Sequence, residues 1–283
     1  MPPVLDCGRS LPAGYTFVDP DALDPTSWSF WLGALLALAV QWVAFVPALL
    51  RRTERFYDLV GSATFVGAIA LALCQGWPLD ARSVVLALVV VVWALRLGTY
   101  LVRRIRRAGR DDRFDEIKRS FPRFLLAWTL QGVWVVVTSA PAVLAIRRSG
   151  ETPVEPLLFI GLVLWVIGFS VEVVADSQKA RFAADPTNRG RFIATGMWAR
   201  SRHPNYFGEI LLWTGVAVIA SPVLAGWERL ALISPVFVAW LLIRVSGIPQ
   251  LERKAQARWG GDPAYEAWYR RTPRLLLRLG PSA

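Results

Sequence analysis

The chain has 283 residues, of which 54% are hydrophobic, and it carries a formal net charge of +11 with a single histidine. Soluble domains are usually less apolar and more highly charged, and about 20 consecutive apolar residues are enough to span a bilayer. The composition therefore argues against a soluble globular domain and favours a polytopic membrane protein.

Seven apolar segments meet this length, and we expect an all-α fold in which each forms a transmembrane helix. In chain order they are residues 28–50, 57–76, 82–102, 124–146, 154–175, 206–225 and 229–248. The residues before them carry four aspartates and lack the basic start and apolar core of a signal peptide. We therefore divide the chain into a tail over 1–27 and one membrane domain over 28–283.

Basic residues gather in alternate loops of this predicted arrangement. Of the 32 Lys and Arg residues, 25 fall after the first, third and fifth spans or in the C-terminal tail. The positive-inside rule assigns these regions to the cytoplasm, which places the N-terminus outside and the C-terminus inside. The simpler interpretation of the basic run 103–123 is that it only sets this topology and binds anionic lipid headgroups.

Several charged or polar residues lie inside the predicted spans or at their ends, and a charge within a span costs about 2.5–3.5 kcal/mol and usually faces a cavity or a partner. They are Asp58, Arg96, Gln131, Glu172, Asp176, Glu209 and Arg244. Spacings of four residues, as between Glu172 and Asp176, place side chains on one helix face. We expect a polar cavity open to the cytoplasm. The alternative is a set of interhelical salt bridges, with Arg96 or Arg244 paired to Glu172 or Glu209.

The segment from 176 to 209 combines arginines, two turn-permitting glycines and Pro204, which stands where a helix would begin. Guanidinium groups match phosphate oxygens, and a helix N-terminus offers free N–H groups to an anion. The pattern predicts an anionic ligand. His203 by itself is more often structural than chemical. With one histidine and two distant cysteines, no metal site is expected.

The run from Arg202 to Glu209, Arg-His-Pro-Asn-Tyr-Phe-Gly-Glu, resembles a signature of the steroid 5-alpha-reductase-like membrane reductases, most closely their bacterial relatives of undefined substrate. The resemblance extends from about Arg51 to Pro273 and includes the stretches 93–100, 172–176 and 247–252. It implies NADPH bound in a cytoplasm-facing cavity and reduction of a carbon–carbon double bond conjugated to a ketone.

The resemblance also implies which residues surround the cofactor, with the cofactor segment running from 172 to 254. By position they are Arg96, Tyr100, Glu172, Asp176, Lys179, Arg181, Asn188, Arg191, Arg202, His203, Asn205, Tyr206, Glu209, Arg244 and Glu252.

The chain departs from the steroid-reducing members where those hold the substrate ketone. They use a Gln-Glu pair in the second span and a tyrosine in the third. Here the pair reads Tyr57-Asp58, and Trp93 stands at the tyrosine position. We therefore take Asp58 and Tyr57 as candidate catalytic residues that hydrogen-bond the carbonyl oxygen of a hydrophobic, steroid- or isoprenoid-like enone.

Two other functions stay open. Membrane methyltransferases similar to isoprenylcysteine carboxyl methyltransferase share an Arg-His-Pro-x-Tyr run and bind S-adenosylmethionine, but that cosubstrate has no phosphate for the arginine-rich segment. A non-catalytic lipid-binding protein on the same scaffold is the second alternative. We expect a monomer in a bacterial inner membrane, with membrane lipids and a hydrophobic small molecule as partners and no nucleic acid.

Overall fold

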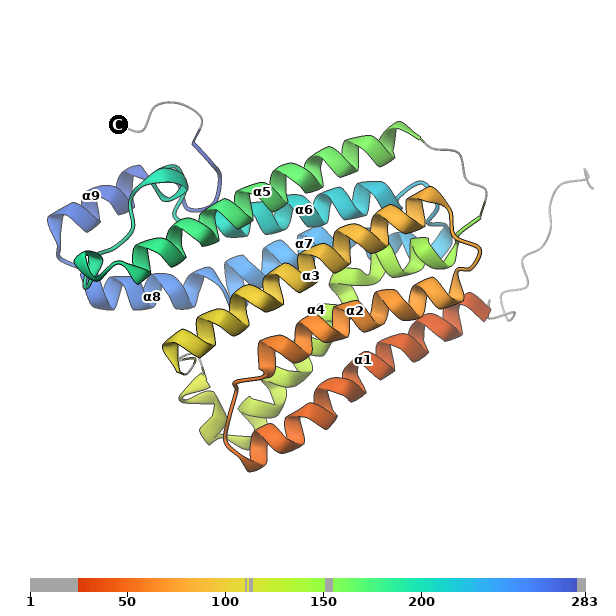
Figure 1. Ribbon diagram of the computed structural model, residues 1–283, viewed down its shortest axis with the longest axis horizontal. Helices are drawn as coiled ribbons and strands as arrows, with labels where there is room; N and C mark the ends of the chain where they lie inside the picture. The colour runs from red at the N-terminus through yellow and green to blue at the C-terminus, as the bar shows by residue number, and fades with distance from the viewer. Residues whose placement is uncertain (1–24, 110, 112–113, 151–154, 279–283) are drawn as a thin grey trace, which may run out of the picture.

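The computed structural model describes residues 25–109, 111, 114–150 and 155–278, and all regular structure within them is helical (Figure 1). The expected all-α fold is thereby confirmed for these residues. Most of the predicted tail, and Cys7 with it, lies outside the described part of the chain.

Nine α-helices and five shorter helical segments follow one another in the described residues. The α-helices are α1 Pro25–Leu50, α2 Tyr57–Gln75, α3 Ala81–Ala108, α4 Phe121–Arg147, α5 Pro156–Ala184, α6 Pro204–Ala220, α7 Ser234–Trp240, α8 Ile248–Trp259 and α9 Pro263–Arg271. The shorter segments are η2 Ile117–Arg119, η3 Pro186–Asn188, η4 Gly196–Ala199, η5 Gly226–Ile233 and η6 Leu241–Val245.

Six helical stretches of the described chain are long and apolar enough to cross a membrane. They are Trp28–Leu50, Tyr57–Gln75, Ala81–Arg106, Phe121–Arg147, Pro156–Ala184 and Gly226–Trp259. The predicted span 206–225 corresponds to α6, whose 17 residues reach about 25 Å. These helices indicate an integral membrane protein, while the count of seven spans and the orientation of the termini stay predictions.

Local signals set several helix ends. The Asp80 carboxylate accepts a hydrogen bond from Ser83 N at 2.8 Å and caps the start of α3. Gly109, with a φ of +78°, ends the same helix, because glycine adopts this left-handed conformation without strain. Pro204 occupies the first position of α6, as the sequence predicts.

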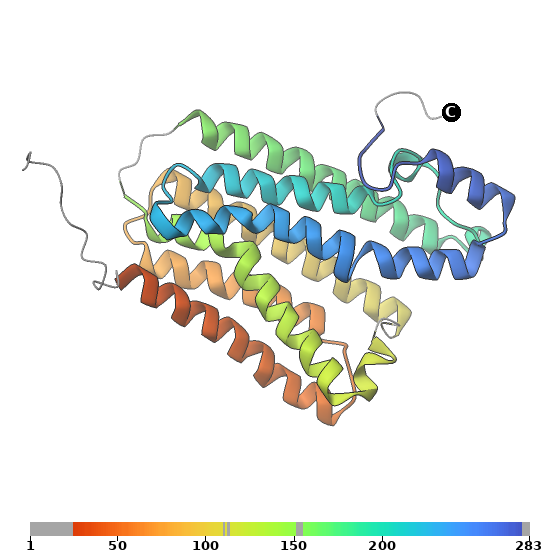
Figure 2. The same ribbon diagram turned by 180° about the vertical axis from the view of Figure 1, so that it is seen from behind.

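The long helices run side by side along one axis, and α8 and α9 extend beyond one end of the bundle (Figures 1 and 2). We call this end, where α1, α3 and α5 finish and α2, α4 and α6 begin, the basic end. The opposite end is the distal end. All the candidate cofactor residues therefore lie on elements that reach the basic end.

Helices α5 and α6 pack closely through glycines. A Cβ atom at Gly168 would lie 2.6 Å from Gly208 O, and one at Gly161 would lie 2.6 Å from Gly215 O. Small residues allow helix backbones to approach in this way within membranes. The contact places Glu172 and Asp176 of α5 beside the first turns of α6.

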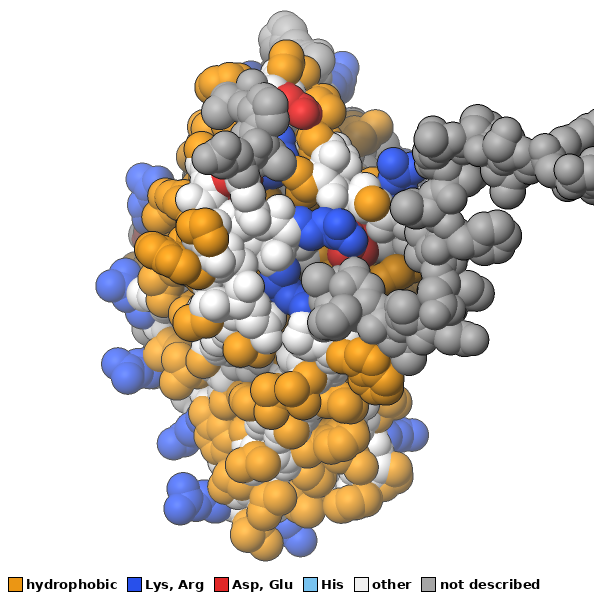
Figure 3. Space-filling view, turned by 90° about the vertical axis from the view of Figure 1, so that its right-hand side faces the viewer, with side chains coloured by type: hydrophobic (Ala, Val, Ile, Leu, Met, Phe, Trp, Pro, Cys, Tyr) orange, Lys and Arg blue, Asp and Glu red, His pale blue; other side chains and the backbone are white. Residues whose placement is uncertain are grey.

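Aromatic rings fill the core between α2, α3, α4 and α6. The Trp93 ring centroid lies 5.0 Å from Phe65 and 4.8 Å from Trp213. Large apolar side chains such as Val43 and Leu88 are instead exposed on the lateral surface. Figure 3, which looks onto the distal end, shows hydrophobic side chains over most of the lower part of the molecule. Such a surface suits contact with lipid rather than water.

Candidate functional site

Arg96 of α3 is held between two carboxylates of α5. Its Nη1 lies 2.5 Å from Glu172 Oε1, and its Nη2 lies 2.6 Å from Asp176 Oδ2. The four-residue spacing of the two acids puts both on the helix face that meets α3. The salt-bridge alternative is therefore realised for Arg96 and Glu172.

Asn205 and Glu209 at the start of α6 complete a group that we call the central cluster. Its members are Arg96, Tyr100, Glu172, Asp176, Asn205 and Glu209. Asn205 Nδ2 donates to Asp176 Oδ1 at 3.2 Å, and the Arg96 guanidinium carbon lies 5.4 Å from the Tyr100 ring centroid. Glu209 is 9% exposed and forms no hydrogen bond to the described residues. Of the three carboxylates in the cluster, only those of Glu172 and Asp176 pair with the Arg96 guanidinium, so the cluster has hydrogen-bond acceptors to offer a ligand.

A second group of residues contacts Glu252 of α8 near the start of α6, and we call it the Glu252 cluster. Its carboxylate lies 2.9 Å from Arg202 Nη1, 3.4 Å from His203 Nε2 and 3.5 Å from Arg274 Nε. Tyr269 joins the cluster from α9, with its ring centroid 3.8 Å from the Arg202 guanidinium carbon. Sequence reasoning selected Arg202, His203 and Glu252 but missed Tyr269, which lies within the resemblance, and Arg274, which lies just beyond its end.

The residues after α9 lie against the residues before α6. Arg202 N donates to Pro273 O at 2.9 Å, and Arg278 N donates to Arg200 O at 3.0 Å. Ser201 Oγ also donates to Leu275 O at 2.8 Å. The C-terminal segment therefore holds the first residues of α6 in place.

His203 gives the Glu252 cluster a predicted pH dependence. Burial lowers the pKa of His203 below its ordinary value, and the Glu252 carboxylate opposes this shift. The unfolded chain takes up the proton near a pH of about 6.5, whereas the folded protein keeps the imidazole neutral to lower pH. Stability should therefore fall as the pH decreases through that interval.

Because His203 is the only histidine, the His203→Gln variant should lose this part of the pH dependence. Thermal unfolding of the purified protein from about pH 7.5 to 5.5 tests the expectation. The same fall in stability in the variant would assign it to other groups.

Six predicted cofactor residues lie outside both clusters, and four of these stand on the periphery of the basic end. Asn188 Nδ2 donates to Phe182 O at 3.2 Å. Arg181, Arg191 and Arg244 are exposed and form no ion pair with the described residues. Lys179 lies between the clusters, with its Nζ 4.7 Å from the Trp198 ring centroid, and the Tyr206 ring stacks on His203 with centroids 5.7 Å apart.

Tyr57 is bound within the helix packing. Its hydroxyl donates to Ala127 O at 2.9 Å, and its ring centroid lies 4.8 Å from Phe114 and 5.1 Å from Trp128. The catalytic role of Tyr57 stays a prediction, and it would require this hydrogen bond to break.

Asp58 is 9% exposed and faces Arg104 of α3, whose Nη2 lies 3.8 Å from Asp58 Oδ2 and 2.9 Å from Asp111 Oδ2. Arg104 stands four residues after Tyr100 on α3, one helical turn closer to the basic end. The basic run 103–123 is interpreted from the sequence as facing lipid headgroups. In the structure Arg104 of this run pairs with carboxylates although its side chain is 42% exposed, and the Nζ of Lys118 lies 2.9 Å from Glu54 Oε2.

The described residues contain no set of three or more His, Cys, Asp or Glu side chains placed to hold a metal ion.

Comparison with known proteins adds a family and two relatives. The profile of the family described as "Protein of unknown function (DUF1295)" matches residues 44–272. The chain is 26% identical to the "Probable O-methyltransferase ustE" of Ustilaginoidea virens, over 35% of this chain and 40% of that protein. It is 25% identical to the uncharacterised protein C594.04c of Schizosaccharomyces pombe, over 71% of this chain and 65% of that protein. The matches thus span less than two thirds of either relative. No solved structure matches the chain.

Proposed function

The chain belongs to the DUF1295 family. From this membership and the geometry of the site, we propose that the chain is a membrane enzyme that uses NADPH to reduce a carbon–carbon double bond. This double bond is conjugated to a ketone in a hydrophobic substrate. The observation that carries the proposal is the separation of charge at the basic end. Exposed arginines that pair with no carboxylate of the described residues stand at the periphery, and buried acceptors stand in the central cluster.

The residues present fit a phosphorylated dinucleotide. Arg181, Arg191 and Arg244 are exposed cations whose guanidinium forks match phosphate oxygens. The N-terminus of α6 adds free N–H groups. Asp176 and Glu209 would accept hydrogen bonds from ribose hydroxyl or carboxamide groups.

Asp58 is the residue that we assign to the substrate carbonyl. NADPH supplies the hydride in such a reduction. Negative charge then develops on the carbonyl oxygen, and a donor already positioned at that oxygen lowers the barrier most. A protonated Asp58 would provide this donor. Because the Tyr57 hydroxyl already donates to Ala127 O, Asp58 is the better candidate.

Cofactor binding tests the proposal directly. We expect NADPH to bind the detergent-purified protein and S-adenosylmethionine not to bind, in calorimetric titrations that also include NADH. Arg191→Ala should weaken NADPH binding about tenfold, the effect of losing one charge-assisted hydrogen bond. The matched control is Arg123→Ala, at an exposed arginine on α4. Absence of NADPH binding to the folded wild-type protein would overturn the proposal.

A methyltransferase is the second candidate, because one relative is named as a probable O-methyltransferase. The three carboxylates of the central cluster would also complement the positive sulfonium of S-adenosylmethionine. The same titrations separate the two candidates, since binding of S-adenosylmethionine alone would favour the methyltransferase. Binding of neither compound would favour a non-catalytic lipid-binding protein.

A further inference from the structure

Four glutamates have buried side chains among the residues that the structure describes, and Glu209 differs from the other three because it forms no ion pair. Glu209 is 9% exposed and has neither an ion pair nor a hydrogen bond with the described residues. Burial of an unpaired carboxylate is so costly that such a group usually takes up a proton instead. The other three each have a basic nitrogen within 2.9 Å, in the pairs Glu54–Lys118, Glu172–Arg96 and Glu228–Arg148.

Glu209 faces Glu172 across the contact between α5 and α6. The two helices run in opposite directions, since α5 ends and α6 begins at the basic end (Figures 1 and 2). Asn205 Nδ2 donates to Asp176 Oδ1 at 3.2 Å, and one helical turn from this contact leads to Glu172 on α5 and to Glu209 on α6. A Cβ atom at Gly208 would lie 3.1 Å from the Cβ of Glu172. The two carboxyl groups are therefore neighbours inside the bundle.

One carboxylate oxygen of Glu172 lacks a hydrogen-bond donor. Its Oε1 is bound by Arg96 Nη1 at 2.5 Å, whereas its Oε2 is buried and accepts no hydrogen bond from the described residues. The nearby Trp93 indole nitrogen is also buried without a hydrogen-bond partner, so its N–H is not aligned with this oxygen. A buried acceptor left without a donor costs about 1–3 kcal/mol, and more when it is charged. The neighbouring carboxyl group of Glu209 would supply this donor if it carries a proton.

The surroundings of Glu209 also favour one proton in this pair. Two adjacent carboxylates repel each other strongly in a medium of low dielectric constant, and such pairs keep a proton. Helices α4 and α7, which pack on α6 as well, bring no titratable side chain apart from arginines at the ends of α4. The titratable groups that α3 and α5 contribute around Glu209 are Arg96, Tyr100, Glu172, Asp176 and Lys179.

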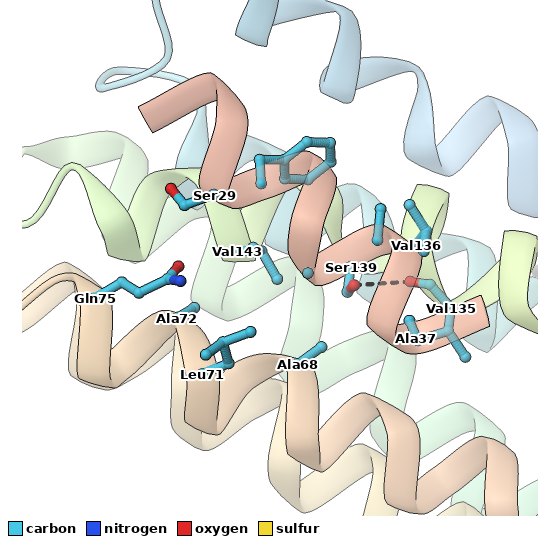
Figure 4. A pocket seen from close by; sticks show the side chains of 13 residues that line it. Ser29, Ala37, Ala68, Leu71, Ala72, Gln75, Val135, Val136, Ser139 and Val143 are labelled. Carbon is cyan, nitrogen blue, oxygen red and sulfur yellow. Dashed lines mark hydrogen bonds between the residues drawn. The ribbon is translucent and has the colours of Figure 1, made fainter. Parts of the chain in front are cut away.

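Solvent in the pocket between α1, α2 and α4 does not solve this problem. All the residues that line the pocket belong to those three helices, as Figure 4 shows for Ala37, Ala68 and Val135. None of them belongs to α5 or α6. The pocket therefore brings no water to the contact of Glu172 and Glu209.

We propose that Glu209 keeps a proton at neutral pH, donates it in a hydrogen bond to Glu172 Oε2, and through this proton sets which cosubstrate the central cluster accepts. The carbonyl oxygen of the neutral Glu209 stays available as an acceptor. The ionised Glu172 and Asp176 are then equal in number to the cations Arg96 and Lys179. A cluster without net charge accommodates an anionic dinucleotide, whereas an ionised Glu209 would add a negative charge that repels it and attracts a sulfonium.

The control of cosubstrate choice rests on the proposed function, but the protonation of Glu209 does not. Infrared spectroscopy of the detergent-purified protein detects the proton without any ligand. A protonated carboxyl group has a C=O stretch that lies apart from carboxylate and amide bands and shifts in D2O. We expect this band in the wild-type protein at neutral pH and its loss in Glu209→Gln.

Glu228→Gln is the matched control for the infrared band, because Glu228 is also buried but lies beside the Arg148 guanidinium. This substitution should leave the band unchanged. Glu116→Gln, at an exposed glutamate, replaces it if Glu228→Gln does not fold.

Two variants of similar size separate a hydrogen-bond donor from a charge at position 209. Glu209→Gln keeps an N–H donor for Glu172 Oε2, whereas Glu209→Met fills the same space without one. We expect Glu209→Gln to unfold at a temperature close to that of the wild-type protein, and Glu209→Met to unfold at a lower one. An ionised Glu209 would give the opposite result, because both variants would remove a repulsive charge and unfold at a higher temperature than the wild type.

The pH dependence of NADPH binding tests the control of cosubstrate choice. Loss of one required proton weakens binding by at most about tenfold per pH unit. We expect the affinity of the wild-type protein for NADPH to fall from about pH 7 to 9, above the second ionisation of phosphate groups. The affinity of Glu209→Gln should stay constant across this range in the same calorimetric titrations, whereas Glu116→Gln should follow the wild type.

Three results would overturn the proposal. A wild-type protein without the infrared band, or a band that persists in Glu209→Gln, would show that Glu209 holds no proton. A Glu209→Met variant as stable as Glu209→Gln would remove the hydrogen bond to Glu172. An equal decline of NADPH affinity in the wild type and in Glu209→Gln would assign that decline to another group.

Failure of the proposed function is distinguishable from these results. If NADPH does not bind at all, the proposed function fails, and the control of cosubstrate choice fails with it. The infrared band and the unfolding temperatures still decide whether Glu209 carries the proton, since neither measurement requires a ligand.

Discussion

Replacing Gly208 by alanine should push α5 and α6 apart and abolish the arrangement of the central cluster. A Cβ at this position would lie 2.5 Å from Gly168 O and 2.7 Å from Glu172 N. Both atoms belong to the backbone of α5, so relief requires the whole helix to move. Overpacking costs about 1–3 kcal/mol in well-packed cores. We expect a loss at the upper end of this range, together with loss of NADPH binding, because Glu172 and Asp176 would move away from Asn205.

Gly67→Ala is the matched control for this prediction, since nothing lies within 4 Å of a Cβ at Gly67 on α2. This substitution should leave stability unchanged or raise it slightly, because alanine favours the helix. Thermal unfolding followed by tryptophan fluorescence and calorimetry with NADPH provide the two readouts. If Gly208→Ala behaves like Gly67→Ala in both, then the close contact of α5 and α6 does not position the site.

The second large effect is expected for Arg96→Met. The variant removes the guanidinium that contacts both Glu172 and Asp176, which are only 2% and 4% exposed. Removing one partner of a buried ion pair leaves uncompensated charge and costs about 3–5 kcal/mol. Because the Arg96 side chain is itself 17% exposed, we expect a loss near the lower limit. NADPH binding should be lost with it.

A rescue experiment separates charge from packing in this prediction. Adding Glu172→Gln and Asp176→Asn to Arg96→Met removes the uncompensated carboxylates, so stability should recover in part while NADPH binding does not. Arg103→Met, at an exposed position of the same helix, should have little effect and serves as the control. This account would be contradicted if Arg96→Met were as stable as the wild-type protein. It would also be contradicted if the triple variant were less stable than Arg96→Met alone.

The sequence by itself determined the helices and the faces of single helices. Long apolar segments specified where the long helices lie, and local signals mark both ends of α3 at Asp80 and Gly109 and the start of α6 at Pro204, because these depend on neighbouring residues alone. The four-residue spacing of Glu172 and Asp176 likewise placed both acids on one face, since helix geometry is local. These parts of the central cluster were therefore predictable.

Only the tertiary structure decided which residues of different helices meet. It paired Arg96 with Glu172 and Asp176 and left Arg244 exposed, although both arginines lie in apolar spans. It also placed the Arg104 guanidinium beside Asp58 and directed the Tyr57 hydroxyl to Ala127. Each of these contacts joins residues at least 46 positions apart. Such contacts depend on how the helices pack, for example through the glycines of α5 and α6, and no spacing along one helix encodes that geometry.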